Sequence, residues 1–228
     1  MRRKQRQEWA QGKRDRKRIA LNAQQGAFVY FALHYEPEAS TSAAGGEFNS
    51  QLDALCALSA LLPAGWRILV KENPQQGFLH RSAVFYERIR LIPNIAFVDD
   101  DCPSQDLLER AQVVATISGT VGFGAMLAGR ACSHFGTPWY AGLPGAIAYH
   151  ARLDLTLHAL QRVQKPELDA AINKLLSQSA NGIIAPRFAH LLGPEANWAS
   201  YADITARSLA AIAALAAPTE TSNILEQN

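Results

Sequence analysis

The chain has 228 residues and a mass of 24.8 kDa. Hydrophobic residues make up 48% and charged residues 18%, which is enough apolar material for a sizeable core and excludes wholesale disorder. The net charge of +2 is unevenly distributed, because residues 1–18 hold nine Lys and Arg against two acids, a net charge of +7, and the rest carries −5. A basic segment on a mildly acidic globule argues against a nucleic-acid-binding domain.

The first element in chain order is this basic segment. Residues 1–25 are polar and lack apolar periodicity, so we expect a basic N-terminal tail outside the α/β core. One interpretation is a solvated or frayed helical tail. Another is an arm that contacts anionic lipid headgroups, where clustered Lys and Arg gain on the order of 1 kcal/mol each. Nuclear import or RNA binding fits the charge equally well, although Trp9 is the one aromatic residue in the segment that could stack on a base.

From residue 26 to residue 150, short apolar runs alternate with amphipathic stretches. This pattern predicts a parallel sheet covered by helices on both faces. The expected strands are residues 27–33, 66–70, 95–98, 113–117 and 131–135, and the expected helices are 51–62, one ending at 85–90, 105–110 and one from 118 to 129. The fold class is therefore an α/β three-layer Rossmann-like domain with a parallel sheet.

Residues 151–216 are expected to form a helical C-terminal extension packed on the same domain, followed by a polar tail at 217–228. Three scattered cysteines lack metal-ligand spacing, so neither a disulfide framework nor a zinc site is expected. No apolar run reaches the ~18 residues that a membrane span requires. We expect a cytoplasmic protein, with contact to the inner membrane only through residues 1–18, and no metal or bound cofactor.

Three strand ends carry polar residues where parallel sheets bind ligands, beyond the carboxyl ends of the strands. After 113–117 come Ser118, Gly119, Thr120, Val121 and Gly122. Small residues at such a junction let backbone amides approach an anion, the helix N-terminus adds positive charge, and the hydroxyls add donors. The pattern matches neither the P-loop nor the dinucleotide fingerprint, which disfavours an ATPase or a dehydrogenase. Simple helix capping explains the same residues.

After 66–70 come Lys71, Asn73 and Pro74, which offer a cation and an amide on a stiff turn, for phosphate, ribose or base. After 27–33 come His34, Glu36 and Glu38, which are candidates for acid–base catalysis if they are buried together. A solvated loop fits these three equally well. The acidic run 99–101 is most simply a solvated turn.

These segments occur in an order that resembles the bacterial capsule polysaccharide biosynthesis family. Its members look like glycosyltransferases of the two-Rossmann (GT-B) type, and some transfer the sugar acid Kdo. The matching residues are Tyr30 to Glu38, Gly45 to Phe48 with Gln51, Leu62 to Trp66, Val70 to Glu72 with Pro74, Pro93-Asn94, Ala115 to Gly122, Gly129, and Phe135-Gly136 with Trp139-Tyr140.

The resemblance implies that the chain is the C-terminal, donor-binding half of such an enzyme. Residues near Pro74 and Ser118–Gly122 would contact a nucleotide-activated sugar, CMP- or UDP-linked. The family usually has His where Asn73 stands and Glu where Gly124 stands. A complete enzyme needs two Rossmann halves, so the partner half would lie on a separate chain, or the chain is a fragment or a relic. The alternative is a non-catalytic binding or assembly subunit of the capsule machinery.

Overall fold

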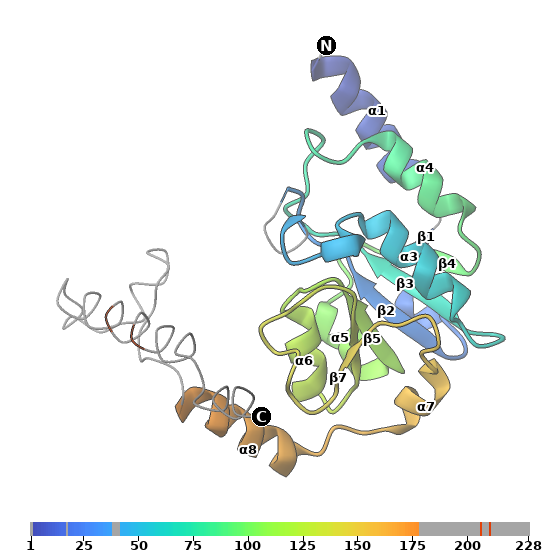
Figure 1. Ribbon diagram of the computed structural model, residues 1–228. Coiled ribbons are helices and arrows are strands. Elements are labelled where there is room, and N and C mark those ends of the chain that lie inside the picture. Colours follow the sequence, from blue (N-terminus) through green and yellow to red (C-terminus); the bar gives the residue numbers. More distant parts are fainter. Residues whose placement is uncertain (1, 17, 38–41, 178–205, 207–209, 211–228) are drawn as a thin grey trace, which may run out of the picture. The chain divides into compact units, whose positions relative to one another are not determined.

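The computed structural model describes residues 2–16, 18–37, 42–177, 206 and 210. Two compact units divide the chain, Met1–Ala171 and Ile172–Asn228. The first unit holds the sheet and the helices that cover it (Figure 1). Glu38, most of the expected extension beyond residue 177, and the tail 217–228 lie outside the described residues.

The described chain forms one parallel sheet of seven strands in the order β1-β4-β3-β2-β5-β6-β7. The strands are β1 (Arg18–Ile19), β2 (Phe28–Ala32), β3 (Arg67–Lys71), β4 (Ile95–Val98), β5 (Val113–Thr116), β6 (Cys132–His134) and β7 (Ala146–Ala148). The five predicted strands are confirmed as β2 to β6, and the fold class is confirmed. The strand order reverses between β2 and β5, which are neighbours in the sheet, and such a switch point opens a crevice at the carboxyl ends of the strands.

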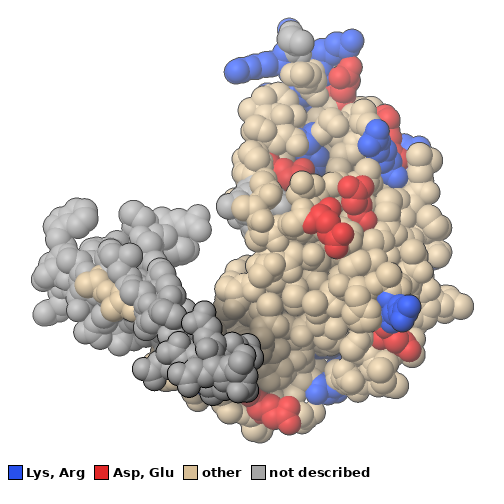
Figure 2. Space-filling view, in the orientation of Figure 1, with Lys and Arg blue, Asp and Glu red and all other residues tan. Residues whose placement is uncertain are grey.

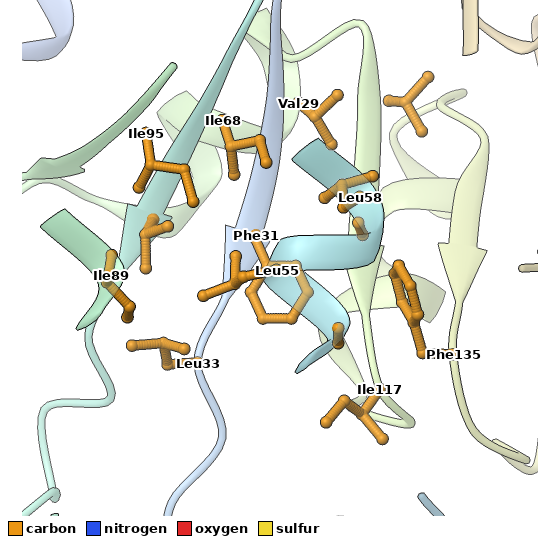
Figure 3. Packing of buried hydrophobic residues seen from close by; sticks show 14 of the residues in the cluster. Val29, Phe31, Leu33, Leu55, Leu58, Ile68, Ile89, Ile95, Ile117 and Phe135 are labelled. Carbon is orange, nitrogen blue, oxygen red and sulfur yellow. The ribbon is translucent and has the colours of Figure 1, made fainter. Parts of the chain in front are cut away.

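Helices cover both faces of the sheet. Val29 and Phe31 of β2 pack on one face with α3 (Gln51–Ala60), α4 (Ala83–Leu91) and α7 (Leu155–Leu160) (Figure 3). Tyr30, which alternates with them, is buried on the opposite face, where α5 (Ser104–Arg110) and α6 (Val121–Leu127) lie. Strands buried on both faces read as continuous apolar runs, and this is why the sequence predicted them.

Short polar signals set several element boundaries. Ser50 begins α3, because its hydroxyl accepts a hydrogen bond from the amide of Asp53 over 3.3 Å. Asn94 turns the chain into β4 with a φ of 61°, a left-handed conformation that asparagine tolerates. Two short 3₁₀ turns, Leu21–Ala23 and Gly46–Phe48, precede β2 and α3.

The N-terminal segment differs from the expected tail. Arg2–Asp15 is a helix, α1, that packs on α4, with Gly12 so close that a Cβ there would lie 3.1 Å from the Cα of Ala83. Arg18–Ile19 then joins the sheet beside β4. The expectation of a segment outside the core was wrong. Gly12 and Arg16, which a search for apolar periodicity does not count, are buried, and Trp9 packs against the main core. Basic side chains of α1 gather at its outer end (Figure 2).

The acidic run also differs from a solvated turn. The side chain of Arg16 is fully buried, 4.9 Å above the Phe97 ring, and forms an ion pair with Asp100. Lys13 approaches the same carboxylate at 3.3 Å. Partial burial of Asp100 opposes its ionisation, but the charges of Arg16 and Lys13 outweigh this effect and lower its pKa.

The C-terminal part contains α7 and α8 (Lys165–Ser177). Leu155 of α7 belongs to the main core, whereas the chain from Ile172 onward is a separate compact unit. Within the described ranges, no helix combines the length and the hydropathy that crossing a membrane requires.

Candidate functional site

A cavity of about 640 Å³ opens at the carboxyl ends of β2, β3 and β5. Its position is the switch point of the sheet, where the strand order reverses. The wall is formed by four stretches of chain and two residues of α5: Tyr30, Ala32, Leu33 and His34; Lys71 to Pro74; Ser104 and Leu108; Thr116 and Ser118 to Val121; and Trp139. The cavity therefore unites residues from all three predicted strand ends.

The end of β5 leads into the predicted strand-to-helix junction. Ser118, Gly119 and Thr120 all line the cavity; Ser118 is buried and Thr120 is exposed. The hydroxyl of Thr116 accepts a hydrogen bond from the amide of Gly119 over 3.2 Å, which fixes the turn. The amide of Gly122, the second residue of α6, donates a hydrogen bond to the carbonyl of Gly119 over 3.1 Å, which tightens the turn further.

Gly122 plays a different role from the predicted phosphate contact. It is buried and is not part of the cavity wall, and a Cβ there would lie 2.1 Å from the hydroxyl of Tyr140 and 2.5 Å from the Sγ of Cys132. The space is taken by Tyr140, which donates a hydrogen bond to the carbonyl of Gly119 over 2.6 Å. Burial, followed by the neighbouring Cys132, raises the pKa of Tyr140, so its hydroxyl keeps the proton that it donates.

The end of β3 places its three predicted residues on the cavity wall. The ammonium of Lys71 donates to the carbonyl of Cys102 and, over 3.0 Å, to the hydroxyl of Ser104. An ammonium carries three donors, so one remains beyond these two bonds. The side-chain oxygen of Asn73 accepts from the amide of Gln75 over 3.0 Å, which closes a tight turn before the exposed Pro74.

The end of β2 brings only one of its three candidates to the cavity. His34 lines the wall, and its Nε2 lies 2.8 Å from the Thr116 hydroxyl. The carboxylate of Glu36 instead receives a hydrogen bond from Gln51 and lies 3.6 Å from Arg81. Glu38 lies outside the described residues. His34 and Glu36 therefore do not come together in the cavity, as the expected cluster of titratable groups would require.

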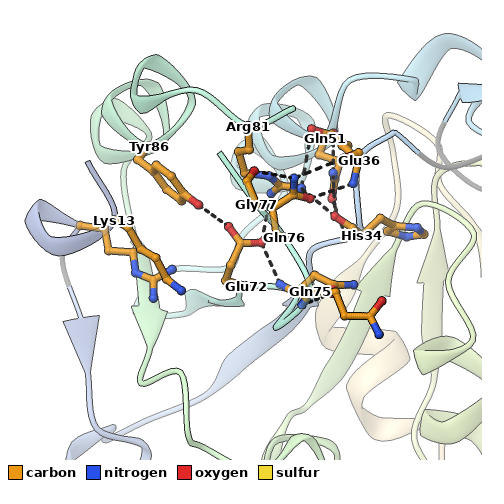
Figure 4. Close-up of polar contacts among 12 residues, drawn as sticks. Lys13, His34, Glu36, Gln51, Glu72, Gln75, Gln76, Gly77, Arg81 and Tyr86 are labelled. Atoms are coloured by element: carbon orange, nitrogen blue, oxygen red, sulfur yellow. Dashed lines mark hydrogen bonds and ion pairs between the residues drawn. The ribbon is translucent and has the colours of Figure 1, made fainter. Parts of the chain in front are cut away.

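A buried polar network, which the sequence did not reveal, lies around Arg81 (Figure 4). Its guanidinium donates to the carbonyl of His34 over 2.7 Å and lies 3.4 Å from the carboxylate of Glu72. Tyr86 donates to the second oxygen of that carboxylate over 2.7 Å. Burial and the charge of Glu72 raise the pKa of Tyr86. The network joins the ends of β2 and β3.

Four further residues of the cavity wall were not predicted as site residues: Tyr30, Ser104, Thr116 and Trp139. Burial raises the pKa of Tyr30 to about 12, and Ser104 shares a hydrogen bond with it. A strand residue whose neighbours are all apolar gives no signal of a polar role. Among the described residues, no group of three or more His, Cys, Asp or Glu is placed to hold a metal ion.

A parallel α/β sheet with a switch point and a cavity at that point defines a Rossmann-like domain. The family model described as "Capsule polysaccharide biosynthesis protein" matches residues 1–181, and the chain belongs to this family. No match was found among curated proteins.

Several solved structures are similar to the chain. Two are KpsC from Thermosulfurimonas dismutans, a beta Kdo 2,7 transferase and a beta Kdo 2,4 transferase, each 18% identical, with TM-scores of 0.42 and 0.43. Both matches cover 68% of this chain and 55% of the other. The glycotransferase of kitacinnamycin is 16% identical with a TM-score of 0.37, covering 71% of this chain and 41% of that one. The chain thus spans about half the length of the KpsC structures.

Proposed function

We propose that the chain is the donor-binding part of a glycosyltransferase in capsule or surface polysaccharide biosynthesis. In this proposal a CMP- or UDP-linked sugar occupies the cavity at the switch point. The single observation that carries it is the convergence of Lys71, the turn Ser118–Thr120 and His34 on one cavity. Its volume of about 640 Å³ falls within the ~300–1,000 Å³ typical of small-molecule sites.

Phosphate recognition is assigned to two sides of the cavity. On one side, the remaining donor of Lys71 supplies a positive charge that the backbone of Cys102 and the hydroxyl of Ser104 hold in place. On the other side, the hydroxyls of Ser118 and Thr120 supply uncharged donors. Charged and uncharged hydrogen-bond donors on two sides of the cavity can bind a phosphate group. They do not select one nucleotide over another.

His34 is the described acid–base candidate that reaches the cavity. Its Nε2 is bonded to Thr116, and its backbone is held by Gln51 through a 2.7 Å hydrogen bond to the amide. A histidine so positioned can orient a substrate hydroxyl or exchange a proton with it. Transfer itself also requires an acceptor site, which we assign to a second Rossmann half on a separate chain.

The alternative function is a non-catalytic binding or assembly subunit of the capsule machinery. The observation that favours it is that Asn73 and Gly124 stand at the two positions where the family usually has His and Glu. The side-chain oxygen of Asn73 is used to close a turn, and Gly124 carries no side chain at all. One missing electrostatic group can cost a transition state about 10²–10³-fold in rate.

Calorimetric titration with CMP, UMP and UDP tests the nucleotide site. We expect dissociation constants of about 0.1–1 mM, equivalent to roughly −5 kcal/mol. Lys71→Met should weaken each of them about tenfold, because a hydrogen bond to a charged group contributes about 1.5–3 kcal/mol. Lys165→Met is the matched control, since this exposed lysine pairs with Asp169 and is not part of the cavity wall. Absence of binding by all three nucleotides would refute the proposal.

A transfer assay separates the two functions. The chain is incubated with a nucleotide sugar and an acceptor, with and without a candidate partner chain. We expect no measurable transfer by the isolated chain and transfer when the partner half is added. Nucleotide binding with no transfer in either mixture supports the non-catalytic subunit.

A further inference from the structure

Trp139 is an aromatic side chain left exposed at the cavity wall. Its exposed fraction is 56%, and it is the one aromatic among the large hydrophobic side chains that are exposed in the described chain. The other two tryptophans of the described part, Trp9 and Trp66, are half-buried and pack against the core. Tryptophan gains more from burial than almost any other residue, so an exposed indole on a cavity wall is suited to a flat ligand.

The indole packs against two other aromatic rings. The ring of Phe123, in the first turn of α6, lies 4.8 Å from it at an angle of 54°, and the ring of Tyr140 lies 5.5 Å away, edge to face. Tyr140 is in turn bonded to the carbonyl of Gly119. This packing therefore ties Trp139 to the same turn that the proposed function assigns to phosphate.

We infer that Trp139 is the stacking surface for the nucleobase of the bound nucleotide. This inference rests on the proposed function and specifies how the same site holds its ligand. A pre-oriented aromatic ring beside a phosphate-binding turn matches the two ends of a nucleotide, a flat base and an anionic group. Stacking uses the face that every base has, so Trp139 contributes affinity and not discrimination between cytosine and uracil.

The test compares ligands with and without a base on variants of Trp139. CMP, UMP and ribose 5-phosphate are titrated against the full chain and its Trp139→Ala and Trp139→Phe variants by ligand-observed NMR, which reaches millimolar constants. We expect Trp139→Ala to weaken CMP and UMP about tenfold, and Trp139→Phe to stay within about threefold of the original chain. Ribose 5-phosphate should bind all three proteins equally.

Leu127→Ala is the matched control, because Leu127 is also 56% exposed, lies on α6 and is not part of the cavity wall. It should leave every constant unchanged, and thermal melting should show all variants folded. Equal CMP binding by the original chain and Trp139→Ala overturns the inference and leaves the proposed function standing. An equal loss for ribose 5-phosphate also overturns it, because Trp139 would then hold the sugar ring. No binding of any nucleotide by the original chain overturns both.

Discussion

The guanidinium of Arg81 donates a hydrogen bond of 2.7 Å to the carbonyl oxygen of His34, 47 residues earlier in the chain. The same side chain is fully buried and lies within 3.6 Å of two carboxylates, Glu36 after β2 and Glu72 after β3. One cation thus holds together the two strand ends that form one side of the cavity. This arrangement makes Arg81 a structural support of the site, behind the residues that face the ligand.

Replacing Arg81 should destabilise the protein strongly. Arg81→Met leaves Glu72, only 5% exposed, as a buried charge without its cation, and breaking such a pair costs about 3–5 kcal/mol. The free energy of unfolding, from urea titration, measures the loss. Arg90→Met is the control, because Arg90 is exposed on α4, the helix that follows Arg81, and should change stability by less than about 0.5 kcal/mol. Equal stability of the two variants would contradict the network.

Asp100 should make stability depend on pH in the acidic range. Its pKa is lower in the folded chain than the ordinary 3.8, so it contributes stability above that value, and the contribution is lost as the pH falls through the lowered pKa. Asp100→Asn should be about 1–3 kcal/mol less stable at pH 7, because the buried Arg16 loses its partner. The difference should shrink below pH 3.8. Asp101→Asn, at an exposed position, should show neither effect.

Gly122→Ala should destabilise the start of α6. The added methyl would lie 2.1 Å from the hydroxyl of Tyr140, and such overpacking typically costs about 1–3 kcal/mol. Gly124→Ala is a matched control on the same helix, because its Cβ would meet Leu108 at an ordinary 3.5 Å. It should gain about 0.5–1 kcal/mol from the helix preference of alanine. Adding Tyr140→Phe should restore part of the loss in Gly122→Ala, as measured by thermal melting.

The sequence predicted the strands that are buried on both faces of the sheet. Strands β2 to β5 are buried on both faces, so each reads as an unbroken apolar run. The two missed strands lie at the sheet edges: β1 has two residues, and β7 is only partly buried. The packing of helix α1 on the domain was missed, because the buried Gly12 and the adjoining Arg16 carry no apolar signal and the single tryptophan, Trp9, sets no periodic pattern.

The candidate site was likewise predicted from the sequence only in part. Parallel strands place their carboxyl ends on one edge, so the convergence of His34, Lys71 and Ser118 followed from the order of the elements. The direction of a side chain beyond the strand did not follow. Glu36 turns toward Arg81, a partner 45 positions away whose choice depends on the folded loops. Such a long-range ion pair cannot be predicted from the residues next to Glu36 in the sequence.

Thr116 joins two strand ends through one oxygen atom. Its Oγ1 lies 2.8 Å from the Nε2 of His34 and accepts a hydrogen bond from the amide of Gly119. Thr116 has no exposed surface, so its bond to His34 is buried, whereas the bond from Gly119 is partly buried. The hydroxyl therefore sets the position of the turn 118–120 relative to the imidazole.

Thr116→Val should therefore weaken both the fold and the nucleotide site. Valine has nearly the same shape but no oxygen, so the amide of Gly119 and the Nε2 of His34 lose their partner, at about 1–3 kcal/mol of stability. CMP should bind several-fold more weakly, because the turn and the imidazole are no longer held in register. Thr116→Ser keeps the hydroxyl and should retain most of the CMP affinity. Its stability should fall slightly, because the buried methyl group of threonine is removed. Urea unfolding and ligand-observed NMR measure the two effects separately. If Thr116→Ser lost as much CMP affinity as Thr116→Val, the methyl group and not the hydroxyl would be the part that matters.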